Sequence, residues 1–283
     1  MSTQLYPMVQ FAPDTWELDE FDCASVFVLV GEEKALVIDS GIGIGDLRGA
    51  VERITDKPLI LALSHGHGDH IGNAWQFDEV YLNRKDIGYT QSNTLEMRKG
   101  YAAMIAKRQG GIYAYNPDED ILPPQRQPEF LPLVDGQAFD LGGRRVIAYE
   151  CPGHTPGEMA FLDENTRTLF VGDAVNCNLL INQPPESPTF VSIERAGQGL
   201  KRLAAMGDRY DRMFNGHHDY RALGMPLGED VLRDAIEICR RLVSGEYTPE
   251  TVPSPFPGRP DPVVVKVGRT MITYNERGIH EPE

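Results

Sequence analysis

The amino-acid sequence predicts an α/β fold in which short strands alternate with amphipathic helices. Three observations predict it: the strand-like runs are short and rich in β-branched residues, helical periodicity returns between them, and glycine-rich breaks follow several runs. The 283 residues, with 41% hydrophobic and 24% charged side chains, are enough for a sizeable core. Because apolar strands need cover on their faces, we expect helices to pack on them. We expect residues 1–283 to form a single domain.

The first half of the chain begins with strands. Residues 25–30 and 35–39 are apolar runs joined by a short turn, which predicts a hairpin. Residues 46–54 have helical spacing, and residues 59–63 form an apolar run that is typical of a buried strand. Residues 80–82 predict one more strand before the pattern changes.

An insertion is expected between the two halves. Residues 84–108 have the periodicity of a helix, and residues 110–132 are rich in proline, glycine and acidic side chains. We therefore predict a cap-like insertion at about residues 84–132. Its helical part carries six basic and two acidic side chains, a local charge of +4 in a chain of net charge −15. This segment would steer an anionic substrate if it covers the pocket, and the alternative is a solvated helix face.

The second half of the chain repeats the alternation. Strand character appears at residues 145–150, 159–162 and 168–171, and amphipathic helices follow at residues 193–206 and 229–243. The runs at residues 263–267 and 271–274 predict a terminal hairpin.

Charge and cysteine content restrict the partners and the compartment. With 42 acidic against 27 basic side chains, the chain is not expected to bind nucleic acid, because neutralising phosphates requires a basic face. Its apolar runs fall far short of the roughly 20 residues that a membrane-spanning helix needs, so no membrane partner is expected. The 4 cysteines are widely spaced, which favours reduced thiols over a disulfide framework. The N-terminus also has neither feature of a secretory signal, so we expect a cytoplasmic protein.

Most of the 7 histidines lie in short motifs with other metal-ligating residues. The motif His65-Gly-His-Gly-Asp-His70 follows the run 59–63 and places three histidines and one aspartate within six residues. Its glycines let the chain curl so that neighbouring side chains converge. Imidazole and carboxylate ligands suit zinc, iron or manganese, and no cysteine lies in the motif. This motif therefore predicts a metal site.

Three further polar residues follow strand-like runs across glycine-containing breaks. They are His154 within residues 151–157, Asp173 at the end of residues 169–173, and His217 at the end of residues 214–217. Each residue taken singly is as well explained by a turn or a surface position. Their joint occurrence with the first motif predicts that all of them converge on one site.

Together these motifs resemble the metallo-β-lactamase-fold superfamily, from about residue 22 to residue 218. The resemblance implies a four-layer αββα sandwich with its metal site at the edge where the strand-end loops meet. It also implies two divalent metal ions, with Zn²⁺ favoured and iron or manganese as alternatives. The implied ligands are His65, His67 and His154 for the first ion, Asp69, His70 and His217 for the second, and Asp173 as the bridge.

The resemblance implies further roles for residues at the site. Asp39 matches the family's second-strand aspartate, which supports the metal loop from behind. Asp69 is expected to orient the nucleophile and to carry a proton to the leaving group. The position of His218 leaves an ambiguity, and we favour His217 as the ligand because it directly follows Gly216.

The implied activity is hydrolysis of a small-molecule substrate. A hydroxide held by two metal ions would attack an ester, lactone, thioester or related bond. Class B1 and B2 β-lactamases carry a cysteine, and class B3 a serine, where this chain has Asp173, so β-lactam hydrolysis is less favoured, as is phosphodiester hydrolysis. The carboxylate bridge instead resembles glyoxalase II and the lactonases. The alternative is an iron-dependent oxidoreductase of the persulfide dioxygenase type, which uses the positions of His65, His154 and Asp173. Oligomeric state is left open.

Overall fold

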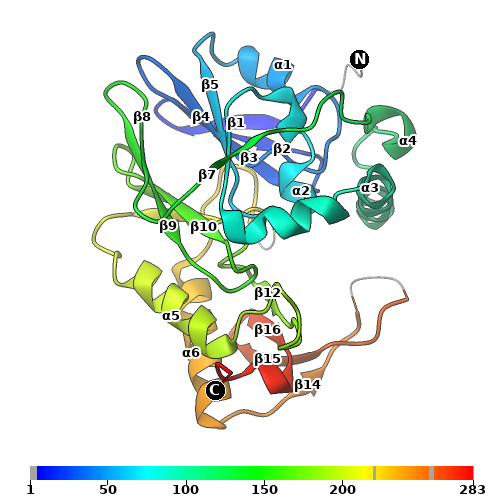
Figure 1. Cartoon of the computed structure of the whole chain (residues 1–283), viewed down its shortest axis with the longest axis vertical. Coiled ribbons are helices and arrows are strands. Elements are labelled where there is room, and N and C mark those ends of the chain that lie inside the picture. Colours follow the sequence, from blue (N-terminus) through cyan, green and yellow to red (C-terminus); the bar gives the residue numbers. More distant parts are fainter. Residues whose placement is uncertain (1–4, 219–220, 255–257, 283) are drawn as a thin grey trace.

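A computed structural model describes residues 5–218, 221–254 and 258–282 (Figure 1). Its largest sheet has seven strands in chain order: β1 (Met8–Ala12), β2 (Thr15–Asp19), β3 (Ser25–Val30), β4 (Ala35–Ile38), β5 (Leu59–Ala62), β6 (Val80–Leu82) and β7 (Phe130–Pro132). The strands are antiparallel from β1 to β4 and parallel from β4 to β7. The predicted hairpin of residues 25–39 is therefore present as β3 and β4.

Two smaller sheets contain the other strands of the described ranges. The second sheet has five strands in the order β13 (Arg212–Phe214), β11 (Thr168–Phe170), β10 (Met159–Asp163), β9 (Arg145–Glu150) and β8 (Ala138–Asp140). The third sheet has four strands in the order β12 (Asn178–Ile181), β16 (Thr270–Tyr274), β15 (Val263–Val267) and β14 (Glu250–Thr251). The predicted terminal hairpin is confirmed by the antiparallel pairing of β15 with β16.

Helices cover the outer faces of the two larger sheets. The α-helices are α1 (Leu47–Glu52), α2 (Gly68–Ile71), α3 (Leu95–Gln109), α4 (Pro117–Asp120), α5 (Ile193–Ala204) and α6 (Glu229–Ser244). Short 3₁₀ helices occur at η1 (Ala74–Gln76), η2 (Arg84–Ser92) and η3 (Glu276–Gly278). No helix within the described ranges is long and apolar enough to cross a membrane.

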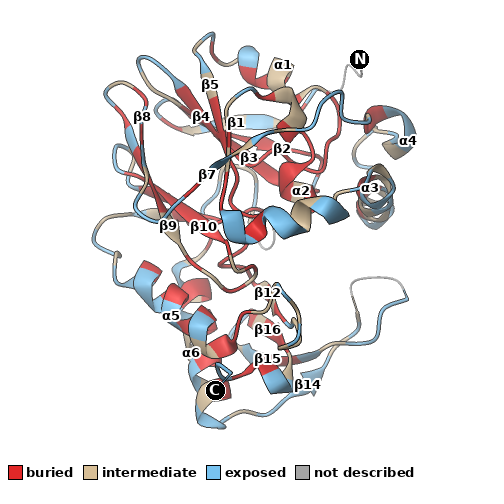
Figure 2. Ribbon diagram, viewed as in Figure 1, coloured by how far each residue is buried: buried red, intermediate tan, exposed pale blue. Residues whose placement is uncertain are grey.

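The alternation of side chains along each strand creates the layers. Phe27 of β3 points between the two larger sheets, where it packs with Phe161 and Phe170 of the second sheet. Its neighbour Val28 points the other way, toward the cluster that includes α1 and α3. The outer face of the second sheet packs on α5 and α6 in a third cluster. Figure 2 shows buried residues along both sheets and on α5 and α6. The four-layer αββα arrangement is confirmed.

The segment between β6 and β7 differs from the predicted single helix. Residues 84–92 form η2, and Thr94 then begins α3, since its hydroxyl accepts a hydrogen bond from the Met97 amide at 3.2 Å. The prediction of one continuous helix over residues 84–108 is therefore wrong. The segment contains two helices, η2 and α3, because the N-cap Thr94 starts the second one. Residues 130–132, expected in a loop, form the edge strand β7, which pairs parallel with β6. Whether residues 84–132 cap the site stays a prediction.

Candidate metal centre

The side chains expected at the metal site all follow the carboxyl ends of strands. Asp39 follows β4, the His65–His70 motif follows β5, and the loops after β9, β11 and β13 carry the other three residues. These ends share one edge because β4 and β5 are parallel, as are β11 and β13. Backbone hydrogen bonds join the two sheets there, from Met159 to Ser64 and from Ser25 to Gly216, both at 2.8 Å.

Three imidazoles form a first group. His67 Nδ1 lies 3.1 Å from His65 Nε2 and 2.9 Å from His154 Nε2. His154 Nδ1 donates to the carbonyl of Leu180 at 3.0 Å, so the Nε2 of a neutral ring presents a lone pair to the centre. His65 Nδ1 is likewise occupied, since it lies 3.0 Å from Ser64 Oγ. The nitrogens of these rings therefore face one another.

A second group combines two imidazoles with a carboxylate. Asp69 Oδ2 lies 3.7 Å from His217 Nε2 and 3.9 Å from His70 Nε2. Asp173 lies between the two groups: its Oδ2 is 3.2 Å from His217 Nε2 and 3.7 Å from His154 Nε2, and its Oδ1 is 3.8 Å from His70 Nε2. The structure thus brings together all seven side chains predicted as ligands.

The arrangement fits divalent metal ions. His70 Nε2 and Asp173 Oδ1 are both buried without a hydrogen-bond partner, a costly state for polar atoms unless something else coordinates them. In the first group His67 Nδ1 faces two imidazole nitrogens and can donate a proton to only one of them at a time. A cation between the nitrogens would satisfy all three lone pairs. The set of donors, five imidazoles and two carboxylates, is one that zinc, iron and manganese accept.

The charges within the centre follow from burial and from neighbouring groups. Burial, followed by the imidazole of His154, lowers the pKa of His67 to about 3 and keeps that ring neutral. Burial would also lower the pKa of His70, but the carboxylates of Asp69, Asp39 and Asp173 raise it to about 9. Burial would raise the pKa of Asp173, and the imidazoles of His217 and His70 reverse this, so its pKa is well below the ordinary value. The charged side chains that this balance identifies are therefore His70 and Asp173.

Asp39 lies behind the loop of the His65–His70 motif and contacts both of its ends. Its Oδ1 accepts from the Ser64 amide at 2.7 Å, and its Oδ2 accepts from Ser64 Oγ at 2.8 Å and lies 2.9 Å from His70 Nδ1. This contact leaves His70 Nε2 to face the centre. The backbone of Asp39 is left-handed, with φ of 64°, a conformation that aspartate and asparagine tolerate better than most residues.

Two buried carboxylates that support the centre do not stand out in the sequence. Glu158 accepts from the Asp173 amide at 3.0 Å and lies 3.5 Å from His65 Nδ1. Asp86, in η2, accepts from the Gly66 amide at 3.0 Å, the Gly157 amide at 2.7 Å and Thr155 Oγ1 at 2.6 Å. Asp86 therefore ties the loop of the first motif to the loop that carries His154. Both residues lie outside motifs, and only their contacts across the fold reveal them.

A pocket of about 320 Å³ opens over the centre. Its wall includes Asp69, Tyr101, Met104 and Arg108, so α3 contributes one side of it. Burial, followed by the Asp69 carboxylate, raises the pKa of Tyr101 well above its ordinary value, so its hydroxyl remains protonated. Tyr101 therefore lines the pocket with a protonated hydroxyl, which donates to the Cys23 carbonyl at 3.5 Å.

Several basic residues of the insertion point elsewhere. Arg98 is buried, and its guanidinium donates to backbone carbonyls, including that of Gly72 at 3.2 Å. Lys85 pairs with Glu150 at 2.7 Å. Part of the local charge of +4 therefore lies in side chains that hold the fold together. Among these basic residues, Arg108 lines the metal pocket.

His218 contacts acidic residues of β2 and its following turn instead of the two groups. Its Nε2 lies 3.1 Å from Glu17 Oε1, and its Nδ1 lies 3.8 Å from Asp19 Oδ1. Burial would lower the pKa of His218, but Asp22, Glu17 and Asp19 raise it to about 9. The contacts of His217 with Asp69 and Asp173 agree with our preference for His217 over its neighbour as a ligand.

Several known proteins are similar to this chain in sequence. The acyl-coenzyme A thioesterase MBLAC2 of Homo sapiens is 27% identical over 186 residues, which cover 58% of this chain and 62% of that relative. The hydroxyacylglutathione hydrolase GloC of Haemophilus influenzae is 26% identical over 164 residues, covering 51% of this chain and 62% of the relative. An atrochrysone carboxyl ACP thioesterase of Emericella nidulans is 26% identical over 203 residues, 70% of this chain and 48% of the relative. The matched regions thus leave out a third or more of each of these relatives.

Solved structures share the fold. A metallo-beta-lactamase family protein of Thermus thermophilus aligns with a TM-score of 0.54 at 22% identity and covers 85% of both chains. The sec-alkylsulfatase Pisa1 of Pseudomonas aligns with a TM-score of 0.56 at 14% identity, covering 85% of this chain and 42% of that one. The family model of the metallo-beta-lactamase superfamily matches residues 19–217, a range that contains both groups and Asp173. Because this model covers more than half of the chain, the chain belongs to the metallo-beta-lactamase superfamily.

Proposed function

We propose that this protein is a metal-dependent thioester hydrolase with a small-molecule substrate. The observation that carries the proposal is the pair of ligand groups around Asp173, with buried atoms of His70 and Asp173 that have no other partner. The bond is suggested by the three relatives described above, since each is named for the hydrolysis of a thioester. Lactones and simple esters present a similar carbonyl group, so they should be assayed alongside thioesters.

We infer that the first group and the second group would each hold one divalent ion, and that Asp173, which contacts imidazoles of both groups, would help to hold them. When bound, such ions lower the pKa of water from 15.7 toward about 7 and polarise a carbonyl oxygen. We favour zinc, with iron or manganese as alternatives. Asp39 and Ser64 would keep the imidazoles of His70 and His65 turned toward the ions, because they contact the outer nitrogens of these rings.

In the reaction, water adds to the thioester carbonyl carbon and the carbon–sulfur bond breaks, which yields a carboxylate and a thiol. Asp69 is suited to hold the attacking water, because its carboxylate lies in the pocket wall between His70 and His217. The proton that the water loses would pass to the Asp69 carboxylate and then to the leaving sulfur. Arg108, also in the wall, is the residue that we expect to attract an anionic substrate.

The compartment is also a proposal. All four cysteines are buried and free, which supports a reducing environment such as the cytoplasm. The acidic balance of the chain supports our expectation that nucleic acid is not a partner.

Metal analysis combined with a substrate panel tests the proposal. Protein purified without added metal would be analysed for elements and then assayed with thioester, lactone, phosphodiester and β-lactam substrates before and after chelation. We expect two divalent ions per chain and thioester hydrolysis that is lost on chelation and restored by added metal. A single iron per chain, with oxygen consumption on glutathione persulfide, would instead favour the oxidoreductase that uses His65, His154 and Asp173.

A further inference from the structure

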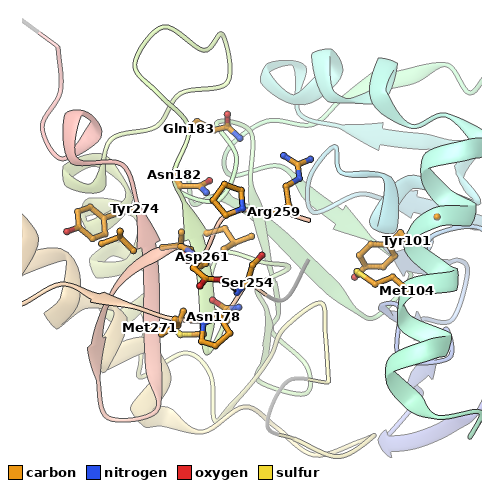
Figure 3. Close-up of a pocket in the computed structure, with 18 of the residues that line it drawn as sticks. Tyr101, Met104, Asn178, Asn182, Gln183, Ser254, Arg259, Asp261, Met271 and Tyr274 are labelled. Carbon is orange, nitrogen blue, oxygen red and sulfur yellow. Dashed lines mark hydrogen bonds between the residues drawn. The ribbon is translucent and has the colours of Figure 1, made fainter. Parts of the chain in front are cut away.

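A second and larger cavity adjoins the metal pocket. Its volume is about 1010 Å³, and it lies between α3 and the third sheet (Figure 3). Both cavities share the wall residues Tyr101, Met104, Asn178 and Leu180. A substrate whose carbonyl lies over the metal centre could therefore extend past these residues into the larger cavity.

Most of the cavity wall is apolar. Met97, Tyr101 and Met104 line it from α3, and Met271 and Tyr274 line it from β16. In Figure 3, Tyr101 and Met104 lie across the cavity from Met271 and Tyr274. Methionine side chains adapt to irregular apolar shapes, so such a wall accommodates flexible hydrocarbon better than rigid rings.

The charges in the wall are balanced. Arg259 and Asp261 both line the cavity and lie two residues apart, so together they contribute no net charge. The other described wall residues are uncharged. Electrostatic attraction of a phosphate-bearing thiol carrier would require an excess of positive charge in the wall. This cavity has no such excess, so it does not select such a carrier electrostatically.

We propose that this cavity binds the acyl chain of the thioester substrate and sets its preferred length. The occupant is an unbranched apolar chain that enters from the metal pocket between Tyr101, Met104 and Leu180. This inference rests on the proposed function, since it assigns the substrate class of the same centre. Each methylene buried in the cavity contributes about 0.8 kcal/mol, which corresponds to about a fourfold rise in kcat/KM per added carbon until the cavity is full.

A series of substrates with one thiol tests the assignment. The acyl thioesters of N-acetylcysteamine, from acetyl to palmitoyl, vary the chain while the thiol part stays constant. We expect kcat/KM to rise with chain length and then level off. A second series with a constant acetyl group and the thiols N-acetylcysteamine, pantetheine and coenzyme A varies the other side of the bond.

Gly100 provides a variant that narrows the cavity. It lies on α3 between Met97 and Met104 and lines the cavity, and a Cβ atom added to it would meet no other atom within 4 Å. Because glycine in a helix interior is unfavourable, Gly100→Leu should preserve or strengthen α3. The matched control is Ala103→Leu, which adds the same side chain to an exposed position of α3 outside this cavity. Met271→Phe narrows the cavity from the opposite wall. It serves as the test variant if Gly100→Leu fails to fold.

The ratio of kcat/KM for long-chain to acetyl thioester should fall at least tenfold in Gly100→Leu and in Met271→Phe, and stay within twofold in Ala103→Leu. Binding of the fluorescent fatty acid 11-(dansylamino)undecanoate to the same proteins gives a readout that needs no turnover, and its Kd should rise at least tenfold in the first two variants.

Different results would overturn the two proposals. Acetyl thioester hydrolysis with no dependence on chain length, or a Gly100→Leu effect confined to the thiol series, would overturn the acyl-chain site and leave the thioesterase standing. Probe binding that depends on Gly100, in a metal-loaded protein that hydrolyses no thioester, would keep the apolar-chain site and reject the proposed function. Probe binding that is equal in Gly100→Leu and Ala103→Leu would reject the site.

Discussion

Gly172 lies at the metal edge and Gly100 lies in the wall of the larger cavity, and their surroundings differ sharply. Gly172 has φ of 51°, and a Cβ there would come within 2.5 Å of Glu158 Oε1 and of Ser64 Cβ. At Gly100 the same added atom would meet nothing within 4 Å. The comparison teaches that the backbone beside the proposed ligands is closely packed, whereas exposed Gly100 on α3 borders open space.

Removing Asp173 should have the largest effect at the metal edge. Asp173→Ala takes away the carboxylate that lies between both groups, so we expect metal loss and a fall in kcat/KM of at least about 100-fold, more than loss of a supporting residue typically causes. Elemental analysis and steady-state kinetics measure both effects. Asp211→Ala is the control, because Asp211 forms an exposed pair with Arg167. An Asp173→Ala protein with its full metal content and normal turnover would refute the assignment.

Weakening the support of His70 should have a smaller effect. Asn at position 39 tolerates the left-handed backbone, but Asp39→Asn loses the charge that holds His70 Nδ1 and the Ser64 amide. We expect metal affinity to fall between about 10-fold and 100-fold, as measured by competition with a chelator.

Asp46→Asn is the matched control for that variant. Asp46 caps α1 by accepting from the Gly49 amide at 2.9 Å, and asparagine caps helices about as well as aspartate. Metal affinity should therefore be unchanged in the control. An equal loss of affinity in both variants would mean that Asp39 has no special role in positioning His70.

The two glycines themselves give the smallest effects and the most direct comparison. Gly172→Ala combines a positive φ with a clash, so it should lower the free energy of unfolding by about 2 kcal/mol. Gly100→Ala should raise the free energy of unfolding by about 0.5–1 kcal/mol, because alanine is the better helix former. Urea denaturation of the metal-free proteins measures both changes. If Gly172→Ala and Gly100→Ala were equally destabilised, the contrast between the close packing at Gly172 and the open space at Gly100 would be wrong.

The sequence was most informative where a local signal coincided with the chemistry. The motif from His65 to His70 carries four side chains of metal-ligand type directly after one apolar run. Its prediction of a metal site therefore did not depend on distant residues. Strands such as β3 and β9 were recognisable because their apolar residues, many of them β-branched, are contiguous. The N-terminal hairpin of β1 and β2 was missed, because acidic residues within it obscured the alternation of side chains.

The sequence by itself determined the α/β class, the ligand types and their places at strand ends, because these depend on neighbours along the chain. Only the tertiary structure decided that Glu158 and Asp86 join Asp39 in supporting the proposed ligands. Asp86 reaches Gly157 across 71 positions of sequence, and such a contact leaves no local pattern. The cavity has the same origin, since β12 pairs with β16 far along the chain and α3 provides the opposite wall. Contacts of this kind are set by how the layers pack, which no single segment encodes.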